Sequence, residues 1–443
     1  MRVIVIGGVA AGMSAASKLK RIRKDWEVMV YEKGGYLSYG ACGLPYYISG
    51  EIPDHESLIA RTPEAFKKSG IDCYLYHEVL KVNPDAKTIE VKNLETGEEK
   101  KESYDKLMIA SGAVSIIPPF PGRDLKNVEV LKTMEDGLRL KEKLTSANIK
   151  KVTIIGGGPI GVEMAETAIN LGIDTKLIQL SDKILTPFDP EITSMAEEEL
   201  IRKGVDLKCS EKVESFHGKE KVEQVQTDKG IYETDLVLIA VDVKPELSFL
   251  DGVAIQRSEN GALVVDREMR TSIPDIYAAG DCAQMYHIGK QENDYIALGT
   301  TANKMGRLAG ENLAGGRVKY RGSLGSAAIR IFDLELGRTG LSEQEAIDLR
   351  IDYDKVVVDA KSNAGYCPDA RPLRIKVIFE KRSRKILGAQ AIGEKGAVLR
   401  VDVFSVAIQA GMTTEELGYA DLCYAPPFAG VWDAINVACN VVK

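Results

Sequence analysis

Residues 151–172 read KVTIIGGGPIGVEMAETAINLG, which is a β-branched run, a tight glycine turn and then a helical pattern. Residues 2–20, RVIVIGGVAAGMSAASKLK, have the same order of features. Both stretches continue into second strand-like segments, at 27–31 and 174–178. A glycine turn between a buried strand and a helix lets the backbone approach a pyrophosphate. The pair therefore predicts an α/β protein with two Rossmann-like dinucleotide-binding domains.

The first unit has an incomplete glycine pattern. Gly7 and Gly12 are present, but Val9 occupies the middle glycine position. Glu32 follows Gly12 by 20 residues, which is the spacing expected for a carboxylate that binds an adenosine ribose. We therefore expect this unit to bind the adenosine end of a dinucleotide.

The second unit has the complete pattern, with Gly156, Gly158 and Gly161. Gln179 stands at the end of its second strand, where an acidic residue usually favours NAD over NADP. Lys183 lies nearby and can meet a phosphate, although a solvated surface lysine is an equally good interpretation. The sequence leaves the choice between NADH and NADPH open.

A third landmark is TSIPDIYAAGDCA at 271–283. It predicts a short strand over 275–278, ending at Gly280 and Asp281 before a helix. An aspartate there can accept a hydrogen bond from a ribityl hydroxyl, and the helix start faces a phosphate. We expect this stretch to close the first unit around FAD.

The order of these landmarks predicts a discontinuous first domain. Buried strands at 105–112 and 235–245 mark the crossings between the two dinucleotide domains. The tail predicts strands near 329–332, 355–359, 374–380 and 385–391, a capping box at Ser342 and Glu345, and a helix over 398–410. The predicted domains are FAD-binding (1–114 and 246–321), NAD(P)-binding (115–245) and a C-terminal α+β dimerisation domain (322–443).

Composition narrows the class of protein. The chain has 443 residues, a net charge of −7 and 44% hydrophobic residues. The negative charge argues against nucleic acid or an anionic membrane as the main partner, and no apolar run reaches transmembrane length. Residues 1–8 do not have the pattern of a secretory signal. Seven scattered cysteines suggest free thiols in a reducing cytoplasm, and we expect no metal site.

Cys42 is the candidate redox residue. It lies in SYGACGLPYY at 38–47, directly after the first dinucleotide unit. Flavin-linked disulfide reductases usually pair such a cysteine with a second one about five residues on, but here that position holds Tyr47. A lone redox cysteine holds its oxidised state as a mixed disulfide or as a sulfenic acid. Because Pro45 suits a helix start, we expect Cys42 at a helix N-terminus with a lowered pKa.

The chain resembles the single-cysteine branch of the pyridine nucleotide–disulfide oxidoreductases over its whole length, and it is most similar to the coenzyme A-disulfide reductases. The matching stretches are GGVAAGMSAA, SYGACGLPYY, TIIGGGPIGVEMAE, YAAGDCA, GTTANKMGR and DLCYAPPFAGVWD. The cysteine stretch and YAPP are the more specific of these. The resemblance implies a homodimer that binds FAD and NADH or NADPH and reduces a small-molecule disulfide, with coenzyme A as substrate or adduct.

The resemblance also implies the site residues. The catalytic set is Cys42 with Tyr366 and Tyr424 of the partner subunit, whose phenols can protonate a leaving thiolate. The FAD set is Gly7, Gly12, Glu32, Lys33, Val79, Ser111, Gly112, Gly280, Asp281 and Ala297. The NAD(P) set is Gly156, Gly158, Pro159, Ile160, Gly161, Glu163, Gln179 and Asp242. The coenzyme A set is Lys18, Arg21, Ser38 and Asn303.

The sequence is also compatible with other functions. An NAD(P)H oxidase or peroxidase would cycle Cys42 through a sulfenic acid, but such enzymes usually carry a histidine where this chain has Ala10. Persulfide reduction would use the same thiol. In an electron-transfer reductase, which passes single electrons to a small iron–sulfur protein, Cys42 would have no role in the reaction. Asp242 stands where the family usually has glycine, so we expect altered nicotinamide binding.

Overall fold

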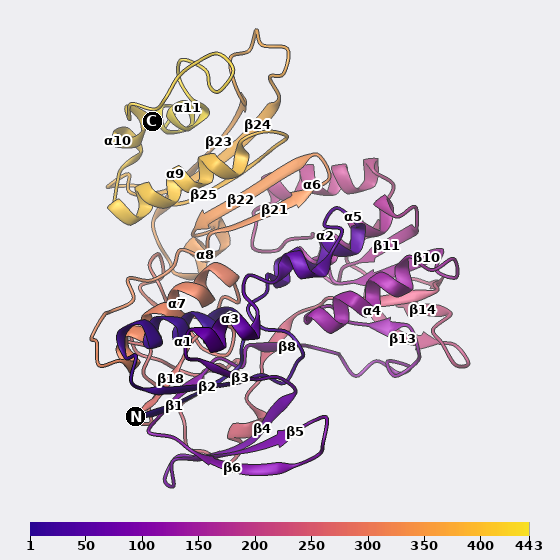
Figure 1. Ribbon diagram of the computed structural model, residues 1–443. Coiled ribbons are helices and arrows are strands. Elements are labelled where there is room, and N and C mark those ends of the chain that lie inside the picture. Colours follow the sequence, from indigo (N-terminus) through magenta and orange to yellow (C-terminus); the bar gives the residue numbers. More distant parts are fainter. Residues whose placement is uncertain (443) are drawn as a thin grey trace.

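The computed structural model describes residues 1–442, which form three groups of elements (Figure 1). The first group lies at the lower left of the view, the second at the right, and the C-terminal group at the top. The helix that follows Cys42 lies in the middle, between the first two groups.

The first group is a parallel sheet with helices, and the chain enters it twice. The order of its central sheet is β18-β7-β1-β2-β3. On the first pass the elements are β1 (Arg2–Ile6), α1 (Ala10–Ile22), β2 (Glu27–Tyr31), η1 (Ala41–Gly43), α2 (Leu44–Ser49), η2 (His55–Leu58), α3 (Pro63–Lys68), β3 (Asp72–Tyr74), β4 (His77–Asn83), β5 (Thr88–Asn93), β6 (Glu99–Ser103), β7 (Lys106–Ile109) and β8 (Ala113–Ser115). On return they are η3 (Ser248–Leu250), β18 (Ile276–Ala278), β19 (Met285–His287), β20 (Glu292–Asp294) and α7 (Gly299–Leu313).

The helices α1 and α7 cross at very close range. A Cβ atom added to Gly306 would lie 2.2 Å from the carbonyl oxygen of Ala11, and one added to Gly310 would lie 2.3 Å from that of Ala15. Two glycines one helical turn apart therefore allow backbone contact between the helices. This contact fixes α7, the last helix of the group, against α1, which begins at the first glycine turn.

The second group repeats this architecture. Its sheet order is β12-β11-β10-β16-β9, and a small sheet of β13, β14 and β15 lies beside it. The elements are β9 (Val128–Glu129), α4 (Met134–Leu144), β10 (Lys151–Ile155), α5 (Pro159–Asn170), β11 (Asp174–Ile178), α6 (Pro190–Arg202), β12 (Asp206–Lys208), β13 (Val213–His217), β14 (Gln224–Thr227), β15 (Ile231–Glu233), β16 (Leu236–Ile239) and β17 (Val243–Pro245). The predicted single strand over 235–245 is wrong, because the chain leaves the sheet after Ile239 and β17 pairs with β8 instead.

The third group is an antiparallel sheet, in the order β21-β22-β25-β24-β23, with α9 against β25 and β22. Its elements are β21 (Ala327–Ile331), β22 (Leu334–Gly340), α8 (Glu343–Asp348), β23 (Tyr353–Lys361), β24 (Pro372–Glu380), β25 (Ile386–Gly393), α9 (Ala397–Ala410), α10 (Thr414–Gly418) and α11 (Ala434–Asn440). The predicted capping box of Ser342 and Glu345 is confirmed. The strand β22 has no counterpart among the strands predicted from the sequence.

Candidate active site

The first glycine turn is fixed by contacts within the protein. Gly7 has a φ of +97°, and a Cβ atom there would lie 2.2 Å from the carbonyl oxygen of Ala110. A Cβ atom on Gly12 would lie 1.9 Å from the carbonyl oxygen of Gly7. Only glycine fits these two positions, so α1 begins directly at the carboxyl edge of the sheet.

Glu32 holds the backbone in place at the same carboxyl edge of the sheet. Its carboxylate accepts hydrogen bonds from the N–H of Gly8 at 2.7 Å and from the N–H of Gly34 at 2.8 Å. Burial raises the pKa of Glu32, and these two N–H donors oppose the rise. The side chain is held where β2 ends, in the position expected for a ribose ligand.

The other predicted FAD residues lie on the same domain. Ser111 and Gly112 follow β7, and a Cβ atom on Gly112 would have no neighbour within 4 Å, so the backbone there faces open space. Gly280 follows β18, and Ala297 precedes α7. Since β7 and β18 are parallel, these turns meet Gly7 and Glu32 at one sheet edge, which is where α/β sheets bind dinucleotides. The residues fit FAD.

Two predicted FAD residues, Lys33 and Val79, do not present a free side chain at this sheet edge. Lys33 is exposed and its Nζ lies 2.7 Å from Glu78. The side chain of Val79 is buried in the hydrophobic core of the first group, at a β-bulge of β4. The side chain of Val79 is therefore not available to a ligand.

Lys132 was missed by the sequence reasoning. Its Nζ lies 3.0 Å from the carboxylate of Asp281, and the hydroxyl of Tyr295 donates to the carbonyl oxygen of Asp281 at 2.8 Å. Lys132 precedes α4 of the second group, so this ion pair joins the two nucleotide units. In sequence it is one lysine before a helix cap, and that pattern does not distinguish it from a surface lysine.

The second glycine turn repeats the first. Gly156 has a φ of +107°, and a Cβ atom on Gly161 would lie 1.9 Å from the carbonyl oxygen of Gly156. Gly158 faces open space at the start of α5, ahead of the exposed Pro159 and the half-buried Ile160. These residues fit a nicotinamide dinucleotide.

Asp242 lies at the crossing between the two nucleotide units. It is exposed, and its Oδ1 accepts a hydrogen bond from the N–H of Val243 at 2.7 Å. Desolvation raises the pKa of Tyr295, with Asp281 and Asp242 among the charges that add to the rise. Asp242 therefore places a negative charge close to the Asp281 turn.

Cys42 lies in the 3-10 turn η1, before the six-residue helix α2. Its side chain is exposed, but the surrounding protein restricts access of water to the sulfur. Desolvation raises the pKa of the thiol, Glu163 raises it further, and Lys132 opposes the rise. The expected lowered pKa is therefore wrong, whereas the expected helix start is confirmed, because Pro45 lies in the first turn of α2 and Cys42 directly precedes that helix. The perturbing charges come from both nucleotide units, so Cys42 lies between them.

Tyr366 and Tyr424 are brought together on the third group. Their side chains are 75% and 46% exposed, and the hydrogen bond that Tyr366 donates to the neighbouring Tyr424 raises the pKa of Tyr366. The two loops are joined where the thiol of Cys367 and the N–H of Ala364 both donate to the carbonyl oxygen of Pro426 at 3.2 Å. The pair forms an exposed two-phenol surface.

The predicted coenzyme A residues lie around α1. The hydroxyl of Ser14 donates to Asn303 of α7 at 2.7 Å, which places Asn303 against α1. Lys18 pairs with Glu311 at 3.0 Å, and Arg21 donates to the carbonyl of Ser17 at 3.0 Å. The N–H of Ser38 donates to the carbonyl oxygen of Gly8 at 2.9 Å, so Ser38 lies next to the first glycine turn. Ser14 had no signal in the sequence that distinguished it from other helix serines.

Two glycine-turn sheets with one exposed cysteine between them define a flavin- and nicotinamide-dependent oxidoreductase. The chain belongs to the pyridine nucleotide-disulphide oxidoreductase family. The sequence model of that family matches residues 1–306, and that of its dimerisation domain matches residues 326–434. Members use FAD and NAD(P)H, and the dimerisation domain makes the protein a homodimer. Within residues 1–442, no helix is long and apolar enough to cross a membrane, and no cluster of three potential metal ligands occurs.

Known relatives cover the whole chain. It is 39% identical to the "NAD(P)H sulfur oxidoreductase (CoA-dependent)" of Pyrococcus furiosus, over 100% of this chain and 99% of the relative. It is 35% identical to an "NADH oxidase" of Methanocaldococcus jannaschii, over 99% of this chain and 98% of the relative. It is 29% identical to the "Coenzyme A disulfide reductase" of Staphylococcus aureus, over 98% of each chain. The solved "NAD-Dependent Persulfide Reductase from A. fulgidus" superposes with a TM-score of 0.96 at 34% identity, over 100% of this chain and 83% of that one.

Proposed function

We propose that the protein is a cytoplasmic NAD(P)H-dependent reductase of coenzyme A disulfide, or of a related low-molecular-weight disulfide or persulfide. The observation that carries the proposal is the exposed Cys42 between two dinucleotide units, with no second cysteine in its turn. Such a thiol must take its redox partner from solution. All seven cysteines are free thiols, which fits a reducing compartment.

Each group of residues has its own part in the proposed reaction. Bound FAD supplies two-electron transfer between the nicotinamide and the sulfur. Cys42 forms the mixed disulfide with coenzyme A and releases it when reduced. Tyr366 and Tyr424 of the partner subunit give a proton to the departing sulfur. Glu32 would hold the adenosine ribose of FAD and Asp281 a ribityl hydroxyl, and Lys18, Arg21, Ser38 and Asn303 would line the coenzyme A path.

A second candidate is an NAD(P)H oxidase or peroxidase, which the Methanocaldococcus relative favours. It would keep Cys42 as a sulfenic acid between turnovers. Against it stands Ala10, the first residue of α1, because an alanine offers no proton donor at the position where such enzymes usually carry a histidine.

Intact mass spectrometry of the protein, denatured without reductant, tests the proposal. We expect the wild-type mass to exceed the calculated mass by one coenzyme A, and we expect Cys42→Ser to remove this increase. Cys423→Ser, which changes the other exposed cysteine, is the matched control and keeps the adduct. An increase of one or two oxygen atoms on Cys42 would instead favour the oxidase or peroxidase.

A further inference from the structure

The helix that follows Cys42 belongs to the first group in sequence, but it packs against the other two groups. Leu44, Tyr47 and Ile48 of α2 share one hydrophobic cluster with residues of α4 and α5 in the second group and of β21 and β22 in the third. A Cβ atom added to Gly137 of α4 would lie 2.6 Å from Cδ2 of Leu44, so α2 and α4 are in close contact. The support of the Cys42 segment therefore comes largely from the second and third groups.

Two side chains of the second group hold the backbone of α2. The Nζ of Lys141 donates to the carbonyl oxygen of Tyr47 at 2.8 Å and lies 3.7 Å from the centre of the Tyr47 ring. A lysine is favourable there, because the last carbonyl groups of a helix have few partners within the helix. The hydroxyl of Thr167 donates to the buried carbonyl oxygen of Pro45 at 3.2 Å. These bonds fix α2 to α4 and α5.

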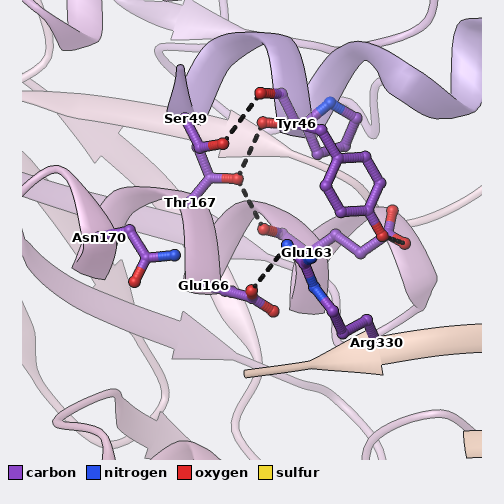
Figure 2. A pocket seen from close by; sticks show the side chains of 8 residues that line it. Tyr46, Ser49, Glu163, Glu166, Thr167, Asn170 and Arg330 are labelled. Atoms are coloured by element: carbon purple, nitrogen blue, oxygen red, sulfur yellow. Dashed lines mark hydrogen bonds and ion pairs between the residues drawn. The ribbon is translucent and has the colours of Figure 1, made fainter. Parts of the chain in front are cut away.

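Arg330 of β21 joins α2 to the third group (Figure 2). Its guanidinium donates two hydrogen bonds to Glu51, at 2.8 and 2.6 Å, and lies 4.7 Å from the centre of the Tyr46 ring. Figure 2 shows this ring beside Arg330, with the Tyr46 hydroxyl directed at Glu163, to which it donates at 3.3 Å. Tyr46 lies within α2 and Glu51 follows it, so one arginine holds both the helix and the chain that leaves it.

Arg330 is itself fixed in place by α5. Its Nη2 donates to Glu166 at 3.2 Å, and Glu166 also accepts from the N–H of Phe332 at 2.8 Å. Glu166 is buried, so this side of the guanidinium is anchored. An exposed ion pair contributes little by itself, but two parallel bonds from a guanidinium fix the orientation of both partners. The three groups therefore meet at Arg330, through Glu51 of the first and Glu166 of the second.

A short connection links this contact to the sulfur. Cys42 lies in η1, and only Gly43 separates it from the first residue of α2. A shift or tilt of α2 must therefore move the sulfur. Reacting groups need to be held closely in place, because a misplacement of about 1 Å can slow a reaction about 100-fold.

We propose that Arg330 is a positioning residue for Cys42: by holding α2 against α5, it fixes the sulfur at the sheet edge where the flavin binds. Lys141 and Thr167 support the same helix from the second group. Arg330 lies within the matched dimerisation domain, so this domain acts on the cysteine of its own chain. The kinetic part of the proposal rests on the proposed disulfide chemistry, whereas the ordering of residues 41–52 does not.

The step that depends on this position is cleavage of the Cys42 mixed disulfide. NAD(P)H gives up a hydride, which corresponds to two electrons and one proton, and becomes NAD(P)⁺. The two electrons break the sulfur–sulfur bond. One proton equivalent goes to the departing sulfur, which leaves as a thiol, and Cys42 remains as a thiolate.

Hydrogen–deuterium exchange of residues 41–52, read by peptide mass spectrometry on the flavin-loaded protein, tests the ordering. Glu51→Gln removes the charge that receives the paired hydrogen bonds, at an exposed site where the protein should still fold. We expect exchange of this segment to be about threefold faster in Glu51→Gln and about tenfold faster in Arg330→Gln. Arg330→Gln also leaves the buried Glu166 without its cation, so Glu51→Gln decides the outcome if Arg330→Gln is unstable.

Stopped-flow absorbance of the flavin, without oxygen, separates positioning from a general loss of structure. The absorbance falls as NADH reduces the flavin, which does not involve the sulfur, and this rate should stay within about twofold of the wild type. The absorbance recovers as electrons pass to the Cys42 mixed disulfide, and this rate should fall about threefold in Glu51→Gln and about tenfold in Arg330→Gln. A purely structural role would change the flavin content or the stability and leave the ratio of the two rates unchanged.

The matched control is Asp333→Asn. Asp333 follows β21 and pairs with Lys203 at 2.6 Å, so it joins the same second and third groups at α6 and not at α2. This variant should leave the exchange of residues 41–52 and both rates unchanged. Unchanged exchange in Glu51→Gln and Arg330→Gln would overturn the proposal, and so would faster exchange with an unaltered recovery rate. A wild type without a coenzyme A adduct would count against the proposed substrate alone, because the exchange rates do not depend on a disulfide.

Discussion

The backbone N–H of Gly157 donates a 2.9 Å hydrogen bond to Oε1 of Gln179. In the first unit, Gly8 and Glu32 make the same bond at 2.7 Å. The residue at the end of the second strand thus fixes the glycine turn in both units. Nε2 of Gln179 donates to the hydroxyl of Ser181 at 2.9 Å, so the second unit keeps the contact but carries no charge there.

Gln179→Glu should shift the nicotinamide preference toward NADH. The new carboxylate keeps the bond to Gly157 but repels the 2′-phosphate of NADPH, and about 1.4 kcal/mol of repulsion lowers kcat/KM for NADPH about tenfold. Steady-state kinetics with both cofactors measure this effect. The kcat/KM for NADH and the FAD content serve as internal controls. Equal losses with NADH and NADPH would show that residue 179 does not face the 2′ position.

Tyr366→Phe and Tyr424→Phe should each lower kcat for disulfide reduction about 10- to 100-fold, because each removes one phenolic proton from a hydrogen-bonded pair. The double variant should lose little more than either single variant, since the two hydroxyls act together. Stopped-flow reduction of the flavin by NADH should remain unchanged. Tyr419→Phe, another exposed tyrosine of the third group, is the matched control. Strictly multiplicative losses would contradict a shared role.

The sequence predicted the two nucleotide units well because each is a local pattern. Strands 27–31 and 174–178 were placed residue for residue. The capping box at Ser342 was equally local. The error at Cys42 has a different origin, because the pKa of its thiol depends on burial and on Glu163, which is 121 residues away.

Contacts between distant segments explain the other omissions. Lys132 is recognised as a site residue only by its ion pair with Asp281. Arg330 is recognised only by its ion pairs with Glu51 and Glu166. No spacing rule links such pairs within a sequence. The strand β22 was missed because Leu334–Gly340 contains two glycines and two charged residues, and it is recognised only by its pairing with β21 and β25.

Leu399→Asp should separate the homodimer. Leu399 and Val406 are 73% and 68% exposed on α9, a helix that is apolar on most of its surface, so an apolar partner surface must cover it. A buried carboxylate in that interface is costly. Sedimentation velocity should show monomers for Leu399→Asp and dimers for Ile201→Asp, which changes an exposed apolar residue on α6. A dimeric Leu399→Asp protein would place the interface elsewhere.

Gly306→Ala should weaken flavin binding. The added methyl group would lie 2.2 Å from the carbonyl oxygen of Ala11, so α7 must move away from α1 and from the first glycine turn. We expect loss of at least half of the bound FAD, measured as the ratio of absorbance at the flavin and protein bands. Gly230→Ala, whose new methyl group would meet nothing closer than 3.8 Å, should keep its flavin. Full flavin content in Gly306→Ala would show that the helix contact does not shape the site.

The stability of the protein should fall in acid because of Glu345. Desolvation alone would raise the pKa of Glu345, but Arg338, the N–H of Ser342 and Lys290 outweigh it and lower the pKa from about 4.5 to about 2. A carboxylate with a depressed pKa stabilises the fold above about pH 4.5, and this contribution disappears as the pH falls toward 2.

Glu345→Gln isolates that contribution, because glutamine also suits the capping box with Ser342. We expect a loss of about 2 kcal/mol in the free energy of unfolding at pH 7 and of about 0.8 kcal/mol at pH 3, measured by urea unfolding at both pH values. Glu416→Gln changes the equivalent residue of the exposed Thr413 capping box, which has no buried cation, and should have little effect at either pH. A gap between wild type and Glu345→Gln that is as large at pH 3 as at pH 7 would mean that packing, and not the charge, makes Glu345 stabilising.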